Sequence, residues 1–239
     1  MNAAMQNAAE GLTLVISDKA DIERDAVAAS WVDAGGEVLR LGRFWDPPAL
    51  EPSCTRVYGA DAFCQVLAQK VGLSLLSPPD DLLLHLPAAV TKRSLSRTFP
   101  GDLATLSYPT FVKSMIPKLI RSRVYESVDA LTAECRGLEP ETELLVSEVV
   151  ALGAEARAWV LDGEVVSIAC YEGECSIVEA AELVRQVATS TLVPAACVID
   201  VALTTDRGWI ALEANAAWGA GLNGCDPSAA VRCIARSST

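Results

Sequence analysis

The chain has 239 residues, of which 51% are hydrophobic and 21% charged, and this composition is typical of a globular protein rather than a disordered one. Its formal net charge of −12 argues against a general role at nucleic acids or membrane surfaces, because such roles favour a basic electrostatic field. The length leaves room for one large domain or two small ones, with a sizeable core.

The first part of the chain reads as a small unit with a parallel sheet. The expected elements are, in order, a strand at 12–17, a helix at 21–36, a strand at 37–42, a short strand at 55–59 and a helix at 61–73. This β–α–β opening predicts an α/β domain. The Pro-rich stretch SPPDD at 77–81 interrupts the pattern. We place the domain boundary near residue 88, which gives an N-terminal domain at 1–88 and a second domain at 89–239.

The second part reads as an α+β domain built from hairpins. The expected elements are a strand at 108–114, a strand or loop at 118–127, a helix at 128–137, a strand at 141–150, a hairpin at 155–171, an amphipathic helix at 176–190, and a last hairpin formed by VIDVAL and WIALEAN. Asp-Gly supplies the turn of the 155–171 hairpin. Hairpins combined with two helices favour α+β over a doubly wound sheet.

Cysteine usage and hydropathy bear on the compartment. None of the eight cysteines forms a CxxC pair, which removes the zinc ribbon and the thioredoxin-type motif. The opening MNAAMQNAAEG has neither basic residues nor a long apolar core, so we expect no secretory signal, and no apolar run reaches membrane-spanning length. We expect a cytoplasmic protein with free, mostly buried thiols. The single histidine, His85, lies in an apolar stretch and is expected to be structural.

The last hairpin carries the clearest chemical signal. A turn centred on Asp206 and Arg207 would set Asp200 opposite Glu213, and strand periodicity adds Asn215 to the same face. Two carboxylates about 5 Å apart repel each other unless a positive group lies between them, and Mg²⁺ prefers such oxygen ligands. The alternative is a solvated sheet face with scattered polar residues, because a one-residue slip in register would move Asp200 to the other face.

Two segments are candidates for binding phosphate. GAGLNG at 219–224 matches GxGxxG, but the 15 residues after it do not read as the rest of a βαβ unit, so we interpret it as a backbone turn that allows chain or ligand to approach closely. No GxxxxGK[ST] motif occurs. Lys113 ends the strand-like FVK and is the better candidate, with further basic residues at Lys118, Arg121 and Arg123. The alternative for each is a solvated basic loop.

Several of these motifs follow the order found in one family. FVK, SEVV, RAWVLDGEVVS, VIDVAL and ALEANAAWGAGLNGCDP occur in the order of an ATP-grasp domain. VYGADAFCQVLAQKVG and SPPDDLLLHLP are similar to the leading domain of a compact clade of that superfamily. The sequence therefore resembles this clade over most of its length. The resemblance implies a small Rossmann-like, pre-ATP-grasp domain, followed by an ATP-grasp fold that binds ATP between two antiparallel sheets.

The resemblance also implies roles for individual positions. The implied ATP-binding residues are Lys113 at the phosphates, Glu148 with the backbone of Val149 and Val150 at the adenine, and Glu155 at the ribose. The implied Mg²⁺ ligands are Asp200, Glu213 and Asn215. Many ATP-grasp ligases carry an arginine two residues before the Asp200 position, where this chain has Val198. The arginine that stabilises the intermediate is therefore expected elsewhere, and the candidates are Arg157, Arg123, Arg93 and Arg121. Lys92 is the candidate for the first ATP-binding lysine.

The function implied by the family is carboxylate activation. An ATP-dependent carboxylate–amine ligase would form an acylphosphate on a small molecule or peptide and pass the acyl group to an amine, with residues 114–125 as a lid. The alternatives are an ATP-grasp kinase that phosphorylates a hydroxyl, and a non-catalytic nucleotide-binding module. The expected partners are the carboxylate and amine substrates, without nucleic acid or membrane, and a homodimer is possible.

Overall fold

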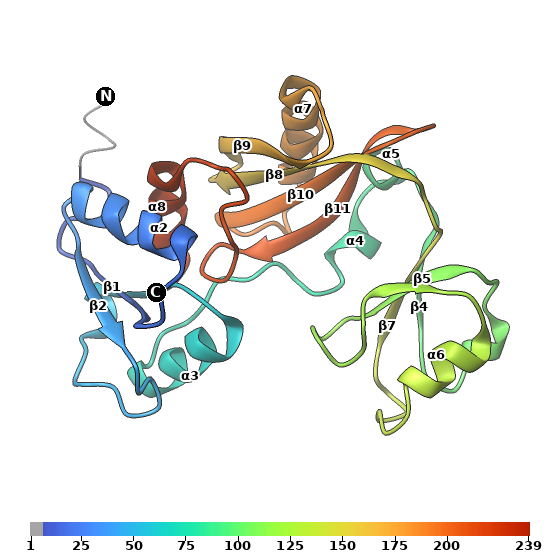
Figure 1. Ribbon diagram of the computed structural model, residues 1–239, viewed down its shortest axis with the longest axis horizontal. Coiled ribbons are helices and arrows are strands. Elements are labelled where there is room, and N and C mark those ends of the chain that lie inside the picture. Colours follow the sequence, from blue (N-terminus) through green and yellow to red (C-terminus); the bar gives the residue numbers. More distant parts are fainter. Residues whose placement is uncertain (1–6) are drawn as a thin grey trace.

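The structure, a computed structural model, describes residues 7–239 and contains three sheets that follow one another along its long axis (Figure 1). Residues 1–6, on which part of the expectation of no secretory signal rests, lie outside the described residues. Among the helices of residues 7–239, none combines the length and hydropathy needed to cross a bilayer.

The N-terminal unit is a three-stranded parallel sheet with the order β2-β1-β3. Its strands are β1 (Thr13–Ser17), β2 (Glu37–Leu41) and β3 (Thr55–Val57), and its helices are α2 (Ile22–Asp33) and α3 (Asp61–Val71). The Asp21 side chain caps α2 by accepting a hydrogen bond from the Arg24 amide, and α3 ends at Gly72, whose φ of 85° suits glycine. The predicted elements are present, and the description of this unit as Rossmann-like stays a prediction.

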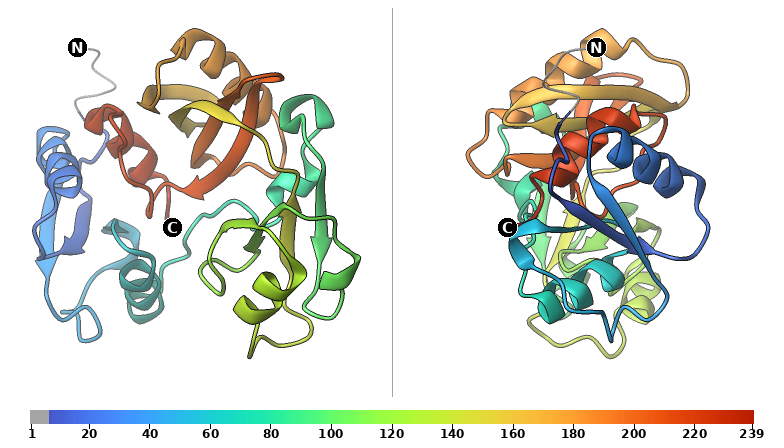
Figure 2. Two further views of the ribbon diagram at one scale, coloured as in Figure 1. Left: turned by 45° about the vertical axis from the view of Figure 1, so that its right-hand side comes forward. Right: turned by 90° about the vertical axis from the view of Figure 1, so that its left-hand side faces the viewer.

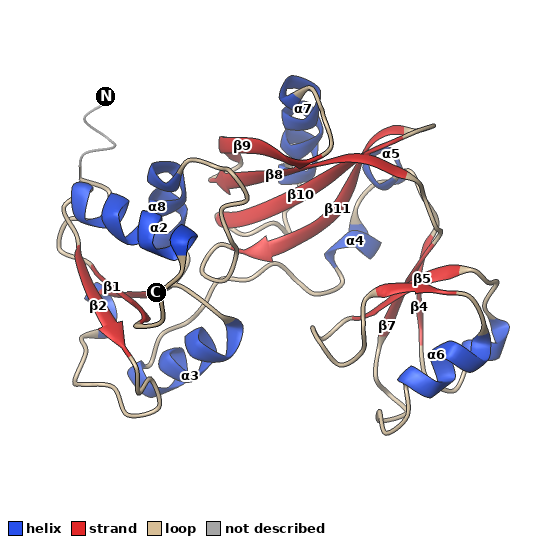
Figure 3. Ribbon diagram, viewed as in Figure 1, coloured by secondary structure: helices blue, strands red, loops and turns tan. Residues whose placement is uncertain are grey.

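The central sheet has four antiparallel strands in the order β11-β10-β8-β9. These are β8 (Leu152–Leu161), β9 (Glu164–Glu172), β10 (Ala196–Thr204) and β11 (Gly208–Ala216). The predicted Asp-Gly turn joins β8 to β9, with both residues at positive φ. One face of the sheet packs on the amphipathic helix α7 (Ile177–Ala188), as Figure 3 shows. The other face carries the polar residues of the candidate site.

The outer sheet is also antiparallel and has the order β4-β7-β5-β6. Its strands are β4 (Leu95–Thr98), β5 (Thr110–Ser114), β6 (Arg123–Tyr125) and β7 (Leu144–Ser147), and the short helix α6 (Val128–Glu134) packs against it. Residues 148–151 join β7 to β8 and so connect the two antiparallel sheets. The prediction of two antiparallel sheets is confirmed.

Helices distant in sequence tie the units together. The C-terminal helix α8 (Pro227–Ala235) packs on α2, and a single buried cluster contains Trp31, Trp159 and Val231 (Figure 2). The short helices α4 (Leu82–His85) and α5 (Ala88–Thr91) pack on the central sheet. The N-terminal unit and the central sheet therefore share a hydrophobic core, and the expected domain boundary near residue 88 stays a prediction.

The cysteines were expected to be free and mostly buried, and the histidine to be structural. All eight cysteines are free, and five of them are buried. His85 Nε2 lies 2.9 Å from Asp81 Oδ2, one helical turn away, so the ring takes part in a local surface contact.

Candidate functional site

The predicted pairing of two acids on neighbouring strands is confirmed. Asp200 on β10 is the register partner of Glu213 on β11. Residues 205–207 form the connecting turn, since Thr204 pairs with Gly208. A bulge between Asp200 and Val201 then absorbs one residue of β11, which places Glu213 opposite Asp200.

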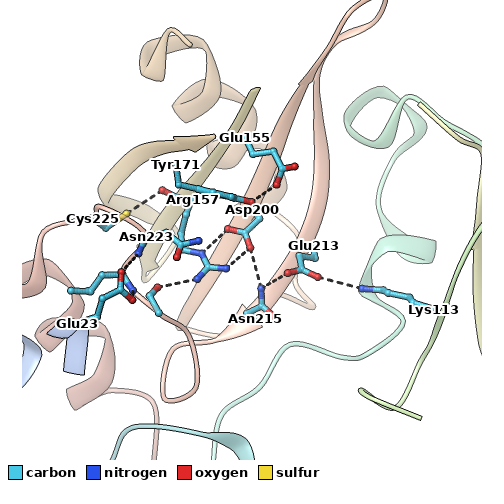
Figure 4. A network of polar contacts seen from close by, with 12 residues as sticks. Glu23, Lys113, Glu155, Arg157, Tyr171, Asp200, Glu213, Asn215, Asn223 and Cys225 are labelled. Atoms are coloured by element: carbon cyan, nitrogen blue, oxygen red, sulfur yellow. Dashed lines mark hydrogen bonds and ion pairs between the residues drawn. The ribbon is translucent and has the colours of Figure 1, made fainter. Parts of the chain in front are cut away.

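Donor groups from three directions hold these acids together (Figure 4). The Asn215 amide donates to Asp200 Oδ2 at 3.2 Å and to Glu213 Oε1 at 3.0 Å. Arg157, on β8, donates through Nε and Nη2 to both oxygens of Asp200, at 2.8 and 2.7 Å. Lys113, on β5 of the outer sheet, places Nζ 3.6 Å from Glu213 Oε2. The structure thus brings together Lys113, Arg157 and the three residues expected to bind a metal.

Burial separates the two acids. The Asp200 side chain is 1% exposed and that of Arg157 12%, whereas Glu213 is 40% exposed. Burial raises the pKa of Asp200 above its ordinary value, although the hydrogen bonds from Arg157 oppose the rise. Burial acts to lower the pKa of Arg157, but the hydrogen bonds and charge of Asp200 outweigh it and the shift is upward. The guanidinium therefore remains charged, in a bidentate pair with Asp200.

Lys113, Arg157, Glu213 and Asn215 line a cleft of about 870 Å³ in which the three parts of the chain meet, whereas Asp200 is buried and does not line it. The outer sheet contributes Lys113, and the loop after it contributes Lys118. The central sheet and its glycine turn contribute Arg157, Glu213, Asn215 and residues 219–221. The N-terminal unit and the segment after it contribute Asp61, Gln65 and Asp80. The cleft thus carries positive charge from Lys113, Lys118 and Arg157. Its negative charge comes from Glu213 on the central sheet and from Asp61 and Asp80 on the N-terminal wall.

The donor set fits a hard divalent cation. Within residues 7–239, no group of three or more His, Cys, Asp or Glu side chains is arranged to hold a metal, so a cation here would rely on an amide and on substrate oxygens as well. Half a turn of the Asn215 amide would bring its oxygen to the position of the nitrogen that now contacts both carboxylates. Two carboxylates, an amide oxygen and phosphate oxygens form a set that Mg²⁺ accepts.

The residues expected at the nucleotide base and ribose are not among those that line the cleft, and they lie at or near the connection between the two sheets. Glu148 accepts hydrogen bonds from Arg207 Nη1 and Nη2, at 2.9 and 2.5 Å, and from the Ser94 amide at 3.1 Å. The Arg207 hydrogen bonds, followed by that of Ser94, lower the pKa of Glu148 to about 2. Val149 follows with 41% of its surface exposed. Val150, the next residue in this connection, is partly exposed.

Glu155, expected at the ribose, accepts a hydrogen bond from the Tyr171 hydroxyl, and the Arg157 guanidinium lies 5.9 Å from the centre of the Tyr171 ring. The sequence did not single out Tyr171 or Arg207. The composition around Arg207 predicts a turn but does not indicate which residue the arginine contacts. The contact between Tyr171 and Glu155 depends on how β8 pairs with β9, which the sequence alone does not specify. The only signal available in the sequence was Glu155, an acid at the start of the predicted 155–171 hairpin.

Two of the other candidate arginines take structural positions. Arg93 donates from Nε to Ser147 Oγ at 3.1 Å and from Nη1 to the Ala211 carbonyl at 2.7 Å, so it joins the outer sheet to the central one. Arg123 lies on β6, with its guanidinium 4.7 Å from the centre of the Tyr125 ring and 3.7 Å from Glu134 Oε2. Neither residue lines the cleft, so the structure does not bring them to the acids.

Two further expected residues also lie outside the cleft. Arg121 is paired with Glu134, with 3.7 Å between Nε and Oε1. Lys92 donates to the Arg207 carbonyl at 3.2 Å, beside the connection between the sheets.

The glycine turn behaves as a close-approach segment. The Glu23 carboxylate, at the start of α2, accepts hydrogen bonds from the amides of Leu222 and Asn223, at 2.8 and 2.9 Å. A Cβ at Gly221 would lie 2.7 Å from Glu23 Oε2. The prediction that this turn allows another part of the chain to approach closely is confirmed.

Comparisons with known proteins agree with this architecture. A model of the ATP-grasp domain of the R-2-K clade, family 2, matches residues 91–233. The fold is similar to that of a RimK domain ATP-grasp protein from Sphaerobacter thermophilus, with 17% identity, a TM-score of 0.60, and coverage of 94% of this chain and 98% of that one. It is also similar to N5-carboxyaminoimidazole synthase from Aspergillus clavatus, in complex with ADP and 5-aminoimidazole ribonucleotide, with 12% identity, a TM-score of 0.59 and coverage of 96% and 78%.

A third similar structure is the ATP-grasp ligase PsnB complexed with its minimal precursor, with 13% identity, a TM-score of 0.52 and coverage of 88% and 90%. A comparison with curated protein sequences gave no significant match. The similarity to solved structures establishes the fold, and the family match extends over more than half of the sequence. The chain therefore belongs to the ATP-grasp proteins of the R-2-K clade, family 2.

Proposed function

We propose that this protein is an ATP-dependent carboxylate–amine ligase, which forms an amide bond through an acylphosphate on a small molecule or a peptide. The observation that carries the proposal is the convergence of Lys113, Arg157 and Glu213, from two different sheets, on one cleft that the N-terminal unit also walls. The structural neighbour PsnB, named as an ATP-grasp ligase and complexed with its minimal precursor, supports this class of reaction.

Each residue has a role that its chemistry allows. Lys113 is a point charge for the phosphates of ATP. Glu148, the backbone of Val149 and Val150, and Glu155 would bind the adenine and ribose. Asp200, Glu213 and Asn215 would hold Mg²⁺, which when bound neutralises charge on the phosphate oxygens. Arg157, fixed by Asp200 and facing the cleft, would stabilise negative charge as it develops on the transferred group.

The reaction balances in two steps. A carboxylate oxygen of the substrate attacks the γ-phosphorus of ATP, the bond to the β-phosphate oxygen breaks, and ADP leaves. The amine then attacks the acyl carbon, inorganic phosphate leaves, and the amine loses a proton. Water would hydrolyse the acylphosphate, so the cleft must close during the reaction. Residues 115–118, which belong to the expected lid, line this cleft, and this supports their assignment to the closure.

The test is product analysis with the purified chain. ATP, Mg²⁺ and pools of carboxylic acids and amines are incubated together, and ADP and free phosphate are followed. Phosphate release that requires both an acid and an amine, with an amide product by mass spectrometry, is the expected result. ADP accompanied by a stable phosphorylated product would instead identify a kinase. ATP binding without turnover across broad pools would identify a nucleotide-binding module. Glu213→Gln serves as the inactive control.

A further inference from the structure

One peptide group in the glycine turn contacts two charged side chains on opposite sides. The Leu222 amide donates to Glu23 Oε2 at 2.8 Å, and the carbonyl of the same peptide, that of Gly221, accepts from Arg157 Nη1 at 3.0 Å. Glu23 belongs to the first turn of α2, whereas Arg157 lies on β8 in the cleft. Figure 4 shows the resulting chain of contacts from Glu23 to Lys113.

The planar geometry of the peptide group links its hydrogen bond to Glu23 with its hydrogen bond to Arg157. A peptide group is planar, so rotation of its N–H away from Glu23 also moves the carbonyl that Arg157 contacts. A negative charge at the N–H end polarises the group and strengthens the hydrogen bond at the carbonyl end. The Asn223 amide supplies a second hydrogen bond to the same carboxylate, at 2.9 Å, so the turn is fixed at two points.

The turn is adapted to this contact. Gly221 has no side chain, and a Cβ there would lie 2.7 Å from Glu23 Oε2. The turn also holds the backbone of Arg157, because the buried Cys225 thiol donates to the Arg157 carbonyl at 3.2 Å.

We propose that Glu23 is a positioning residue for Arg157, acting through the Gly221–Leu222 peptide, and that it couples the N-terminal unit to the active site. Glu23 does not line the cleft, so it acts on the reaction through the turn. Arg157 has Asp200 as its other anchor, and the turn sets the direction of the remaining Nη1 donor.

The direct test observes Arg157 itself. In ¹⁵N-labelled protein, the Nε–H resonance of Arg157 is identified by its loss in Arg157→Lys. We expect Glu23→Gln to shift this resonance or to speed its exchange with water, because a glutamine has one acceptor oxygen in place of the two that the amides now use. The control is Asp33→Asn, an exposed acid of the same helix, which should leave the resonance in place. A folded Glu23→Gln protein with an unchanged Arg157 resonance would overturn the proposal.

A second variant keeps the test independent of how well Glu23→Gln folds. Gly221→Ala retains Glu23 but pushes its carboxylate away, so it should shift the same resonance, and in a Glu23→Ala background it should add little. Equal shifts from Gly221→Ala with and without Glu23 would contradict the coupling.

A kinetic test of the same proposal rests on the proposed function. In the ligase reaction, Glu23→Gln should lower kcat about tenfold or more while the KM for ATP changes little. In an Arg157→Lys background, Glu23→Gln should have no further effect on kcat. A fall in kcat that persists undiminished in Arg157→Lys would contradict action through Arg157. If no substrate pair gives turnover, the proposed ligase activity fails, while the resonance measurement still decides the role of Glu23.

Discussion

Lys113 Nζ lies 3.6 Å from Glu213 Oε2, and this contact crosses from the outer sheet to the central sheet. The side chains are 23% and 40% exposed, so the pair is solvated and its Coulomb attraction is partly screened. In the proposed complex with ATP and its cation, Lys113 would face the triphosphate and Glu213 would face the cation.

The first prediction separates binding from stability at this contact. Lys113→Met should change the free energy of unfolding by less than about 1 kcal/mol, because exposed pairs contribute little. It should weaken the binding of Mg²⁺-ATP by about ten- to a hundredfold, since a charged donor to phosphate is lost. Urea denaturation and calorimetric titration measure the two effects. Lys70→Met, on the exposed side of α3, is the control, and equal ATP affinity in the two variants would contradict the assignment.

The second prediction compares the two paired acids. Asp200→Asn removes the buried partner of Arg157 and should destabilise the protein by about 3 kcal/mol, the cost of a buried charge that loses its partner. Glu213→Gln changes a half-exposed side chain and should cost less than about 1 kcal/mol. Both should abolish turnover. Equal losses of stability in chemical denaturation would show that Asp200 is not the structural member of the pair.

Periodicity and turn chemistry were sufficient to predict the sheets and the main polar face. The pairing of Asp200 with Glu213 was predicted from a two-residue turn, whereas the turn has three residues and a bulge in β11 restores the register. That bulge also places Ile210 opposite Ala202, on the same face of the sheet as Asp200. Local patterns do not report bulges, whose cause lies in the neighbouring strands.

Contacts between residues far apart in the sequence could not be predicted from local sequence patterns. Glu23 and Leu222 are separated by 199 positions, and nothing in either segment specifies the other. Arg93 and Arg123 were equivalent as basic residues near the segment predicted to bind phosphate. Only the folded structure shows that Arg93 contacts the central sheet, whereas Arg123 is half-exposed and paired with Glu134.

The third prediction distinguishes these two arginines. Arg93→Ala should destabilise the protein by about 1–3 kcal/mol, because the Ala211 carbonyl and Ser147 hydroxyl lose their donor at the junction of the sheets. Arg123→Ala removes an exposed ion pair and a contact with the Tyr125 ring, and should cost about 1 kcal/mol or less. Thermal denaturation measures both. A loss of turnover in Arg123→Ala without a change in melting temperature would return Arg123 to the candidate active-site residues.

The fourth prediction concerns pH at the connection between the two antiparallel sheets. Hydrogen bonds from Arg207 and Ser94 lower the pKa of Glu148 from 4.5 to about 2 in the folded protein. A carboxyl whose folded pKa is depressed contributes stability that is complete above its unfolded pKa and is lost as the pH falls toward the folded value. The melting temperatures of the wild type and of Glu148→Gln should therefore differ most above pH 4.5 and converge as the pH approaches about 2.

The comparison with Glu148→Gln isolates this group from other carboxyls, such as Asp25 and Asp81, whose pKa values are also lowered. Arg207→Met should give the same convergence, because it removes the donor whose hydrogen bonds are the largest cause of the shift. Differential scanning calorimetry across this pH range measures the effect. A difference in melting temperature that stays constant from neutral to acid pH would mean that Glu148 titrates alike in the folded and unfolded chains, and Arg207 would then not hold the carboxylate that precedes Val149 and Val150.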